Sequence, residues 1–267
     1  MQVIVCDQPD EATELAANEI LAALEKKPDL VLGLATGSTP IGIYSRLVRA
    51  HQEDKVDFSR VRTFNLDEFV GPPSDHPRSY RSFMRKHLFD GVNVNEGNIH
   101  FPPVEGPALR DKCRDFEATI RDAGGIDIQI LGIGRNGHIG FNEPTSSLAS
   151  RTRIKTLTEK TLLDNSRFDR EKDSTQKLAP TLAATAGIGT ILDARRIMLQ
   201  AFGRAKAEAV RVSIEGPISS FWPGSALQLH DDVTFYLDLE SSALLTMVDY
   251  YRQVRKNAQE LEERGLM

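Results

Sequence analysis

Short apolar runs, each followed by a polar or glycine-rich turn, recur along this 267-residue chain and alternate with amphipathic segments. Three of the runs cover residues 30–34, 61–66 and 126–131. Apolar runs of this length between turn residues are typical of buried strands. Strands that alternate with helices form a mostly parallel sheet whose two faces are covered by helices. The pattern therefore predicts an α/β fold.

The other elements are expected from the same two patterns. Strands are predicted at residues 2–6, 151–157, 196–202 and 233–237, and helices at residues 10–26, 41–51, 80–89, 108–123, 204–214 and 241–264. The last helix is predicted to bury a stripe of Leu244, Leu245, Val248, Tyr251 and Val254. Residues 91–107 are predicted to form a loop, and the very polar segment 158–180 a mobile, partly helical lid. No repeat and no linker is visible, so we predict one domain, 1–267.

Composition and charge narrow the classes of partner. The net charge is −5 and the sequence pI is about 5.7, which gives no support for nucleic-acid binding or a basic membrane patch. The first residues lack the basic region of a signal peptide, and no apolar run approaches the roughly 18 residues of a membrane span. The two cysteines, Cys6 and Cys113, have no metal-ligand or disulfide spacing, so we expect a cytoplasmic protein without a metal.

The turn at residues 36–39 separates a predicted strand from a predicted helix and is a candidate phosphate site. Backbone N–H groups at a helix N-terminus favour an anion, and the hydroxyls of Ser38 and Thr39 add donors beside Gly37. The turn is neither a Walker A loop nor a dinucleotide fingerprint. A solvated turn with helix-capping hydroxyls explains the same residues, so both interpretations stay open here.

Asp67 follows the strand predicted at residues 61–66 and is a candidate general base, because a carboxylate at a strand end can face the ligand crevice. The competing interpretation is that Asp67 or Glu68 caps the next turn. Taken alone, the position favours the cap.

The loop at residues 131–144 holds four glycines around His138. A histidine in such a loop can transfer protons near neutral pH, and Glu143 can orient its ring if the loop curls. A histidine that only bonds a backbone carbonyl is the alternative. Arg167 and Lys206 are candidate phosphate ligands, although the charge run around Arg167 also fits a solvated face.

Several segments in chain order, at residues 34–40, 64–71, 132–144, 146–156, 165–168 and 227–230, together resemble glucosamine-6-phosphate deaminases. The resemblance implies a Rossmann-like parallel sheet with a mobile lid, assembled as a hexamer. It also implies conversion of D-glucosamine 6-phosphate and water to D-fructose 6-phosphate and ammonia, in amino-sugar catabolism, without a metal or other cofactor.

The resemblance assigns roles to individual residues. Asp67 matches the base that moves a proton between C2 and C1 of the sugar, His138 the residue that opens the ring, and Glu143 the carboxylate that tunes this histidine. The clamp on the 6-phosphate is matched by Gly37, Ser38, Thr39, Arg167 and Lys206.

Two further features of the family bear on this chain. Many members carry Asp where Asn136 stands, so His138 is expected to have one carboxylate partner instead of two and an altered pH profile. Some members are activated by N-acetylglucosamine 6-phosphate, and Ser146, Arg153 and Lys155 match that allosteric phosphate site. The C-terminal helix matches more loosely, so the resemblance leaves activation open.

Other functions remain as alternatives. A 6-phosphogluconolactonase of related fold also uses a glycine-rich phosphate turn, and an isomerase of sugar phosphates without ammonia loss is conceivable. A non-catalytic sugar-phosphate sensor is the third alternative. Such a sensor predicts an attached DNA-binding region, whereas here the first strand is expected at residue 2.

Overall fold

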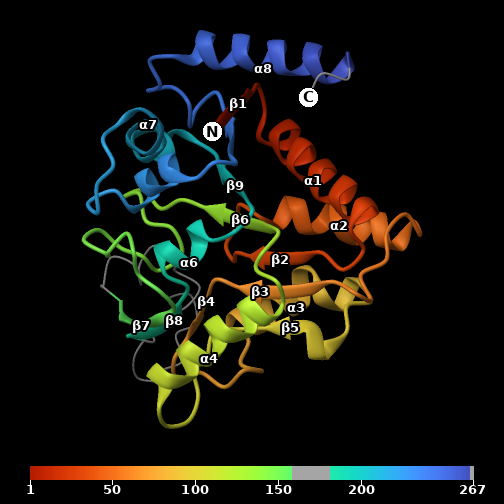
Figure 1. Ribbon diagram of the computed structural model, residues 1–267, viewed down its shortest axis with the longest axis vertical. Coiled ribbons are helices and arrows are strands. Elements are labelled where there is room, and N and C mark those ends of the chain that lie inside the picture. The colour runs from red at the N-terminus through yellow and green to blue at the C-terminus, as the bar shows by residue number, and fades with distance from the viewer. Residues whose placement is uncertain (158–180, 265–267) are drawn as a thin grey trace.

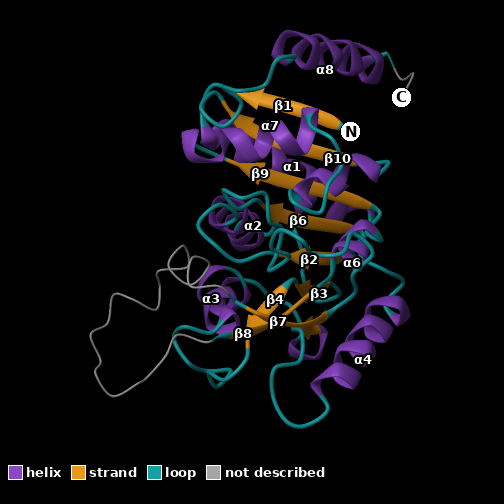
Figure 2. Cartoon of the chain, turned by 90° about the vertical axis from the view of Figure 1, so that its left-hand side faces the viewer, coloured by secondary structure: helices purple, strands orange, loops and turns teal. Residues whose placement is uncertain are grey.

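The computed structural model describes residues 1–157 and 181–264, and its centre is a seven-stranded parallel sheet (Figures 1 and 2). Every neighbouring pair in this sheet is parallel. The strand order is β1 (Gln2–Cys6), β10 (Val233–Asp238), β9 (Arg196–Ala201), β6 (Ile128–Gly132), β2 (Val31–Leu34), β3 (Arg62–Asn65) and β5 (Ile99–His100). The predicted α/β fold with a mostly parallel sheet is confirmed.

Helices cover both faces of the sheet (Figure 1). One buried cluster joins the sheet to α1 (Pro9–Lys26), α2 (Ile41–Gln52) and α3 (Tyr80–His87). A second cluster joins the opposite face to α4 (Leu109–Asp122), α6 (Ile188–Leu192) and α7 (Ala207–Glu215). In α1 the buried residues Ala12, Ala16 and Ile20 recur every four positions, which is the spacing of one helix face.

A small second sheet lies beside the end of the main one. It consists of three antiparallel strands, in the order β4 (Asp67–Phe69), β8 (Leu182–Thr185) and β7 (Arg153–Thr156). Leu66 joins the two sheets, because its N–H donates to Leu34 O at 2.9 Å and its carbonyl accepts from Ala186 N at 2.7 Å. The chain thus leaves the main sheet and enters the second one within a single residue.

Most predicted strands and helices are present, but several short elements were not predicted. These are β4, β5, β8 and α6, together with the 3-10 turns Phe89–Gly91, Glu96–Asn98, Arg204–Lys206 and Pro223–Leu229. The predicted loop at residues 91–107 therefore contains the edge strand β5. Most of these elements have two to five residues and carry too few side chains to show a period. The predicted lid, residues 158–180, lies outside the described residues, and the single-domain organisation stays a prediction.

The C-terminal helix α8 (Val248–Glu263) begins later than predicted. Ser241 explains the difference, because its N–H donates to Asp238 Oδ1 at 2.8 Å and its hydroxyl donates to Ala201 O at 2.7 Å. These bonds hold a turn where a helix was expected. The predicted stripe is also partly wrong, since Leu244 and Val254 are exposed.

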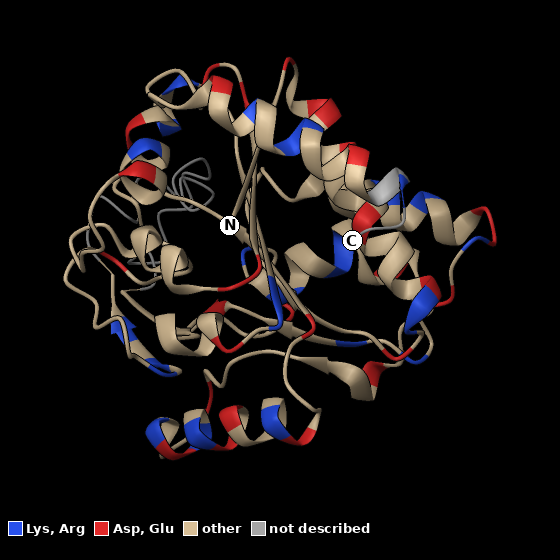
Figure 3. Cartoon of the chain, turned by 45° about the horizontal axis from the view of Figure 1, so that its top comes forward, with Lys and Arg blue, Asp and Glu red and all other residues tan. Residues whose placement is uncertain are grey.

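Lys and Arg alternate with Asp and Glu on the helices seen in Figure 3. Among residues 1–157 and 181–264, no helix has the length and apolar character that crossing a membrane requires. The free cysteines, Cys6 and Cys113, are both buried.

Candidate active site

A cavity of about 400 Å³ opens at the carboxyl ends of the central strands. Its wall comes from the segments that follow β2, β3, β6 and β9. The strand after β2 is β3, which lies on the β5 side of the sheet. The main-sheet strand after β6 is β9, which lies on the β1 side. The cavity therefore lies at the topological switch point, where open α/β sheets bind ligands. Its lining is Ala35, Thr36, Gly37, Ser38, Thr39, Pro40, Leu66, Asp67, Tyr80, Gly132, Ile133, Gly134, Arg135, His138, Gly140, Phe141 and Lys206.

The turn between β2 and α2 forms one end of this cavity. Gly37, Ser38 and Thr39 all line it, and Gly37 has a φ of 114°, a conformation that glycine adopts without strain. Helix α2 begins at Ile41, so the positive end of its dipole lies just behind the turn. The geometry agrees with the phosphate interpretation of this turn.

Lys206 brings a cation to the same cavity. It ends the 3-10 turn after β9, and its Nζ donates to the carbonyl oxygen of Ile133 at 2.6 Å. That bond fixes the ammonium group beside the loop that follows β6. Arg167, the other predicted phosphate ligand, lies outside the described residues.

Asp67 and Glu68 are neighbours on β4 with different surroundings. Asp67 is 6% exposed and lines the cavity. Glu68 instead accepts hydrogen bonds from the backbone N–H groups of Tyr80 and Arg81, at the start of α3. Successive strand residues point to opposite faces. The sequence left open which carboxylate caps the next element, and in the structure this is Glu68.

The glycines of the loop after β6 make room for the ring of His138. A Cβ atom on Gly134 would lie 2.1 Å from Cε1 of this ring. Gly134 N also donates to His138 O at 2.9 Å, so the loop closes on itself. Gly137 has a φ of 78°, and a Cβ atom there would meet Trp222. The close packing therefore requires glycine at positions 134 and 137.

Asn136 bridges His138 and Glu143. Its Oδ1 lies 2.6 Å from His138 Nδ1, and its Nδ2 donates to Glu143 Oε2 at 2.7 Å. Because a carboxylate only accepts, the amide nitrogen of Asn136 must face Glu143 and its oxygen must face the ring. His138 then carries a proton on Nδ1, and in the neutral ring Nε2 holds the lone pair.

Glu143 was predicted to orient the histidine directly. Its Oε1 is 3.4 Å from His138 Nδ1, longer than the 2.6 Å contact made by Asn136. The structure thus brings the three predicted residues together, but the shorter contact to the ring belongs to Asn136. Asn136 and Glu143 support the histidine from behind and do not line the cavity.

The residues matched to an allosteric site do not line this cavity. Ser146 is buried, and its hydroxyl has no hydrogen-bond partner among the described residues. Arg153 and Lys155 lie two positions apart on β7 and so share a face. Burial lowers the pKa of Arg153 below its usual value.

The lining residues that were not predicted as site residues include Arg135, Tyr80 and Phe141. Arg135 lies in the glycine-rich loop, where its charge was a usable signal, while Tyr80 and Phe141 reach the cavity only through packing of α3 and the loop. The Tyr80 and Phe141 rings stack with centroids 6.0 Å apart. In the part of the chain that the structure describes, no group of three or more His, Cys, Asp or Glu side chains could hold a metal ion.

His230 has a structural role. Its Nε2 lies 2.7 Å from Ala194 O, and its Nδ1 accepts a hydrogen bond from Asp232 N at 3.0 Å. This imidazole therefore ties together the segments before β9 and β10.

Comparison with known proteins places the chain among sugar-phosphate enzymes. Residues 8–236 match the family described as glucosamine-6-phosphate isomerases/6-phosphogluconolactonase. The glucosamine-6-phosphate deaminase of Hahella chejuensis is 52% identical over 255 residues, which cover 96% of each chain. That of Shewanella loihica is 48% identical over 264 residues, covering 99% of this chain and 97% of the relative.

Solved structures agree with the sequence relatives. A monomeric glucosamine-6-phosphate deaminase superposes with a TM-score of 0.85 at 44% identity, over 91% of this chain and all of that one. A 6-phosphogluconolactonase from Trypanosoma cruzi shares the fold, with a TM-score of 0.69 at 22% identity, over 92% of this chain and 97% of that one. The predicted resemblance is confirmed: the chain belongs to the glucosamine-6-phosphate deaminase family.

Proposed function

We propose that this protein converts D-glucosamine 6-phosphate and water to D-fructose 6-phosphate and ammonia. The observation that carries the proposal is the meeting of Asp67, His138, Lys206 and the turn at residues 37–39 around one cavity. A base, a proton-transfer group and an anion site are the parts that this reaction needs. The family membership of the chain supports the same activity.

The 6-phosphate binds at the turn formed by Gly37, Ser38 and Thr39. The N-terminus of α2 and the ammonium group of Lys206 supply the positive potential there. Arg167 is proposed as a further ligand. Because the phosphate is remote from C1 and C2, its binding free energy fixes their position without taking part in the chemistry.

His138 opens the sugar ring. Nδ1 bears the proton that faces Asn136, so Nε2 can take the proton of the anomeric hydroxyl and return it to the ring oxygen. The products of this step are the open chain and a neutral imidazole. Glu143 stabilises the imidazolium that forms in between, acting through Asn136 and across the 3.4 Å gap.

Asp67 acts on the open chain. The aldehyde acidifies the C2 proton, and Asp67 removes it while the substrate's C2 ammonium group passes a proton to the C1 oxygen. The resulting enolamine carries a hydroxyl on C1. Return of the proton to C1 leaves an iminium group at C2. Water adds to C2, ammonia leaves, and the ketone remains. The reaction consumes water, so we classify it as a hydrolytic deamination by side-chain proton transfer, without a metal.

We also propose a cytoplasmic location and place the reaction in amino-sugar catabolism, where its product enters hexose-phosphate metabolism. The two buried free cysteines support a reducing compartment. The predicted hexamer and the allosteric role of Ser146, Arg153 and Lys155 remain proposals. A solved relative is described as monomeric, so mass photometry of this protein decides between one and six subunits.

Ammonia release from glucosamine 6-phosphate tests the proposal. Wild type is expected to release ammonia and fructose 6-phosphate in equal amounts, whereas Asp67→Asn is expected to release neither, because its amide cannot take up the C2 proton. Wild-type hydrolysis of 6-phosphogluconolactone without ammonia release would identify a lactonase instead. Binding of the amino sugar without turnover would identify a sensor.

A further inference from the structure

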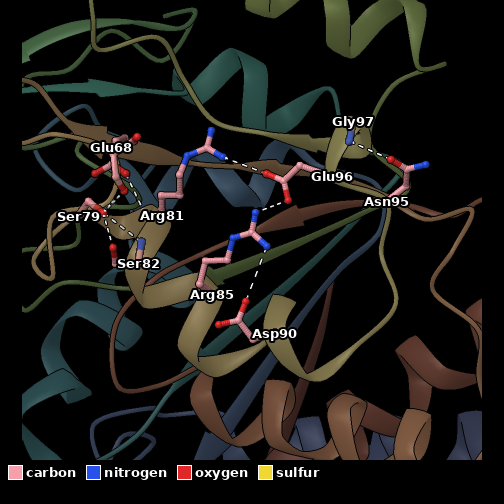
Figure 4. Close-up of polar contacts among 10 residues, drawn as sticks. Glu68, Ser79, Arg81, Ser82, Arg85, Asp90, Asn95, Glu96 and Gly97 are labelled. Carbon is pink, nitrogen blue, oxygen red and sulfur yellow. Dashed lines mark hydrogen bonds and ion pairs between the residues drawn. The ribbon is translucent and has the colours of Figure 1, made fainter.

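Glu68 is a buried carboxylate beside the proposed base, and both of its oxygens accept backbone hydrogen bonds. Oε1 accepts from Phe69 N at 2.8 Å and from Tyr80 N at 2.9 Å, and Oε2 accepts from Arg81 N at 2.9 Å. The side chain thus joins β4 to the first turn of α3, as Figure 4 shows. Only 4% of Glu68 is exposed.

The two elements that Glu68 joins both contribute to the cavity wall. Asp67 lines the cavity from β4, and Tyr80 lines it from α3. Three aromatic rings pack at the same junction. The Phe69 and Tyr80 centroids are 4.7 Å apart, and those of Tyr80 and Phe141 are 6.0 Å apart and nearly parallel. A change in the Glu68 contacts therefore moves a reactive carboxylate relative to the opposite wall.

Ser79 caps α3 from its own segment, because its Oγ accepts from Ser82 N at 3.0 Å. Glu68 caps the same helix from β4, by accepting from Tyr80 N and Arg81 N. On the outer side, Arg81 and Arg85 reach Glu96 (Figure 4). The helix thus has a local cap and a separate ion pair, whereas the Glu68 carboxylate bonds to both α3 and β4 and so joins the two elements.

Keeping this carboxylate charged is costly for the fold. Burial raises the pKa of Glu68 above its ordinary value, and the three N–H donors and the Arg81 cation oppose that rise. A neutral side chain at this position would avoid the cost of burying a charge. The contacts therefore fit a residue that serves the site more than the stability of the protein.

We propose that Glu68 is a positioning residue for the deamination: its carboxylate fixes β4 against the N-terminus of α3, and so fixes Asp67 relative to Tyr80 and the bound sugar. The inference rests on the proposed function, because it takes Asp67 as the base. Glu68 touches neither the reacting atoms nor the phosphate turn.

The test compares Glu68→Gln with two control variants in the ammonia assay. The glutamine offers one acceptor oxygen and turns an NH₂ group towards a backbone N–H, so the junction opens. We expect kcat to fall about 10- to 100-fold, as displacements near 1 Å do in other sites. KM is expected to stay within about threefold of wild type, because the phosphate turn belongs to the main sheet.

The controls separate positioning from helix stability. Ser79→Ala removes the helix cap, and Glu96→Gln removes the outer ion pair with α3. Both are expected to keep kcat within about twofold of wild type, and Ser79→Ala to lower the unfolding temperature. A Ser79→Ala variant that loses as much kcat as Glu68→Gln would overturn the proposal, as would a folded Glu68→Gln variant with wild-type kcat.

A second variant keeps the proposal testable if Glu68→Gln does not fold. Glu68→Asp retains the charge but is one methylene shorter, so it too is expected to lower kcat. Glu68→Asp keeps the negative charge near Asp67, so the acidic limb of its pH–kcat profile should match that of wild type. Glu68→Gln loses this charge, so its acidic limb should move to lower pH. If Glu68→Asp has the kcat of wild type, the positioning role is contradicted. If wild type itself releases no ammonia, the proposed function is contradicted instead.

Discussion

The side-chain oxygen of Asn136 lies 2.6 Å from Nδ1 of His138, closer to this nitrogen than Oε1 of Glu143 at 3.4 Å. A neutral amide thus stands between the histidine and the carboxylate. Its oxygen accepts the Nδ1 proton and so selects the same tautomer as a carboxylate would, but it adds no charge to stabilise the imidazolium.

Replacing Asn136 by Asp is expected to raise the pKa of His138 relative to wild type. The added carboxylate favours the charged ring, so protonation removes the base at a higher pH. The acidic limb of the kcat/KM profile should therefore move to higher pH. Glu143→Gln removes a negative charge and should move it to lower pH. Superimposable profiles for the three proteins would contradict the proposed part of His138 in ring opening.

Gly134→Ala is expected to reduce kcat by about 100-fold or more. The new Cβ would lie 2.1 Å from Cε1 of His138, so the ring has to move, and misplacement of a catalytic group by about 1 Å costs about this much. Gly97→Ala is the control outside the cavity, since a Cβ atom there comes no closer than 3.5 Å to another side chain. Equal activity of the two variants would show that the ring position is unimportant.

Lys206→Ala is expected to raise KM about 10- to 100-fold, with a smaller change in kcat. A hydrogen bond to a charged group contributes about 1.5–3 kcal/mol, and the phosphate is proposed to bind in the ground state and the transition state alike. Arg204→Ala removes an exposed cation from the same 3-10 turn and should leave KM near wild type. Steady-state kinetics at two salt concentrations measures both variants. An unchanged KM in Lys206→Ala would place the phosphate elsewhere.

Glu215 is expected to make the docking of α8 dependent on pH. Burial opposes the charge of Glu215, but hydrogen bonds from Thr246 and Met247 outweigh burial and lower its pKa. A carboxylate with a lowered pKa stabilises the fold above its unfolded-state pKa of about 4.3. That stability is lost as the pH falls through the folded-state value below it.

Glu215→Gln should accordingly lower the unfolding temperature by roughly 2–4 °C at pH 7, and by less as the pH approaches 3. Glu208→Gln is the matched control on the same helix, because its ion pair with Arg211 is exposed and contributes little. Thermal unfolding followed by circular dichroism at several pH values measures the difference. If the unfolding temperatures of wild type and Glu215→Gln differ by the same amount at every pH, the ionised carboxylate has no role.

The sequence allowed prediction of six of the seven main-sheet strands, because these strands are mostly buried apolar runs and the helices between them are amphipathic. It also indicated that Asp67, His138 and the turn at residues 37–39 follow strands, and parallel strands bring such segments to one edge. The pairing of β4 with β8 could not be predicted from the sequence, since Asp67 and Thr185 are far apart in sequence and each strand is short. Tyr80 was missed for the same reason, because only the packing of α3 on β4 brings it to the cavity.

The place of Asn136 between two predicted residues also escaped prediction. Spacing shows that residues 136, 138 and 143 share a loop, but the order of contacts depends on how the glycines bend the backbone. The position of α8 depended likewise on hydrogen bonds from Ser241 that no period in the sequence reveals.

Leu66 connects the main sheet, which carries the turn at residues 37–39, to the second sheet, which carries Asp67. Because this connection is one residue whose N–H and carbonyl are both held by backbone hydrogen bonds, the fold sets the span from the turn to the backbone of Asp67. For a phosphate bound at that turn, we expect a six-carbon ester to bring its C2 to the carboxylate of Asp67. We expect a five-carbon ester to place its C2 one bond short of it, so that chain length becomes a basis for substrate selection.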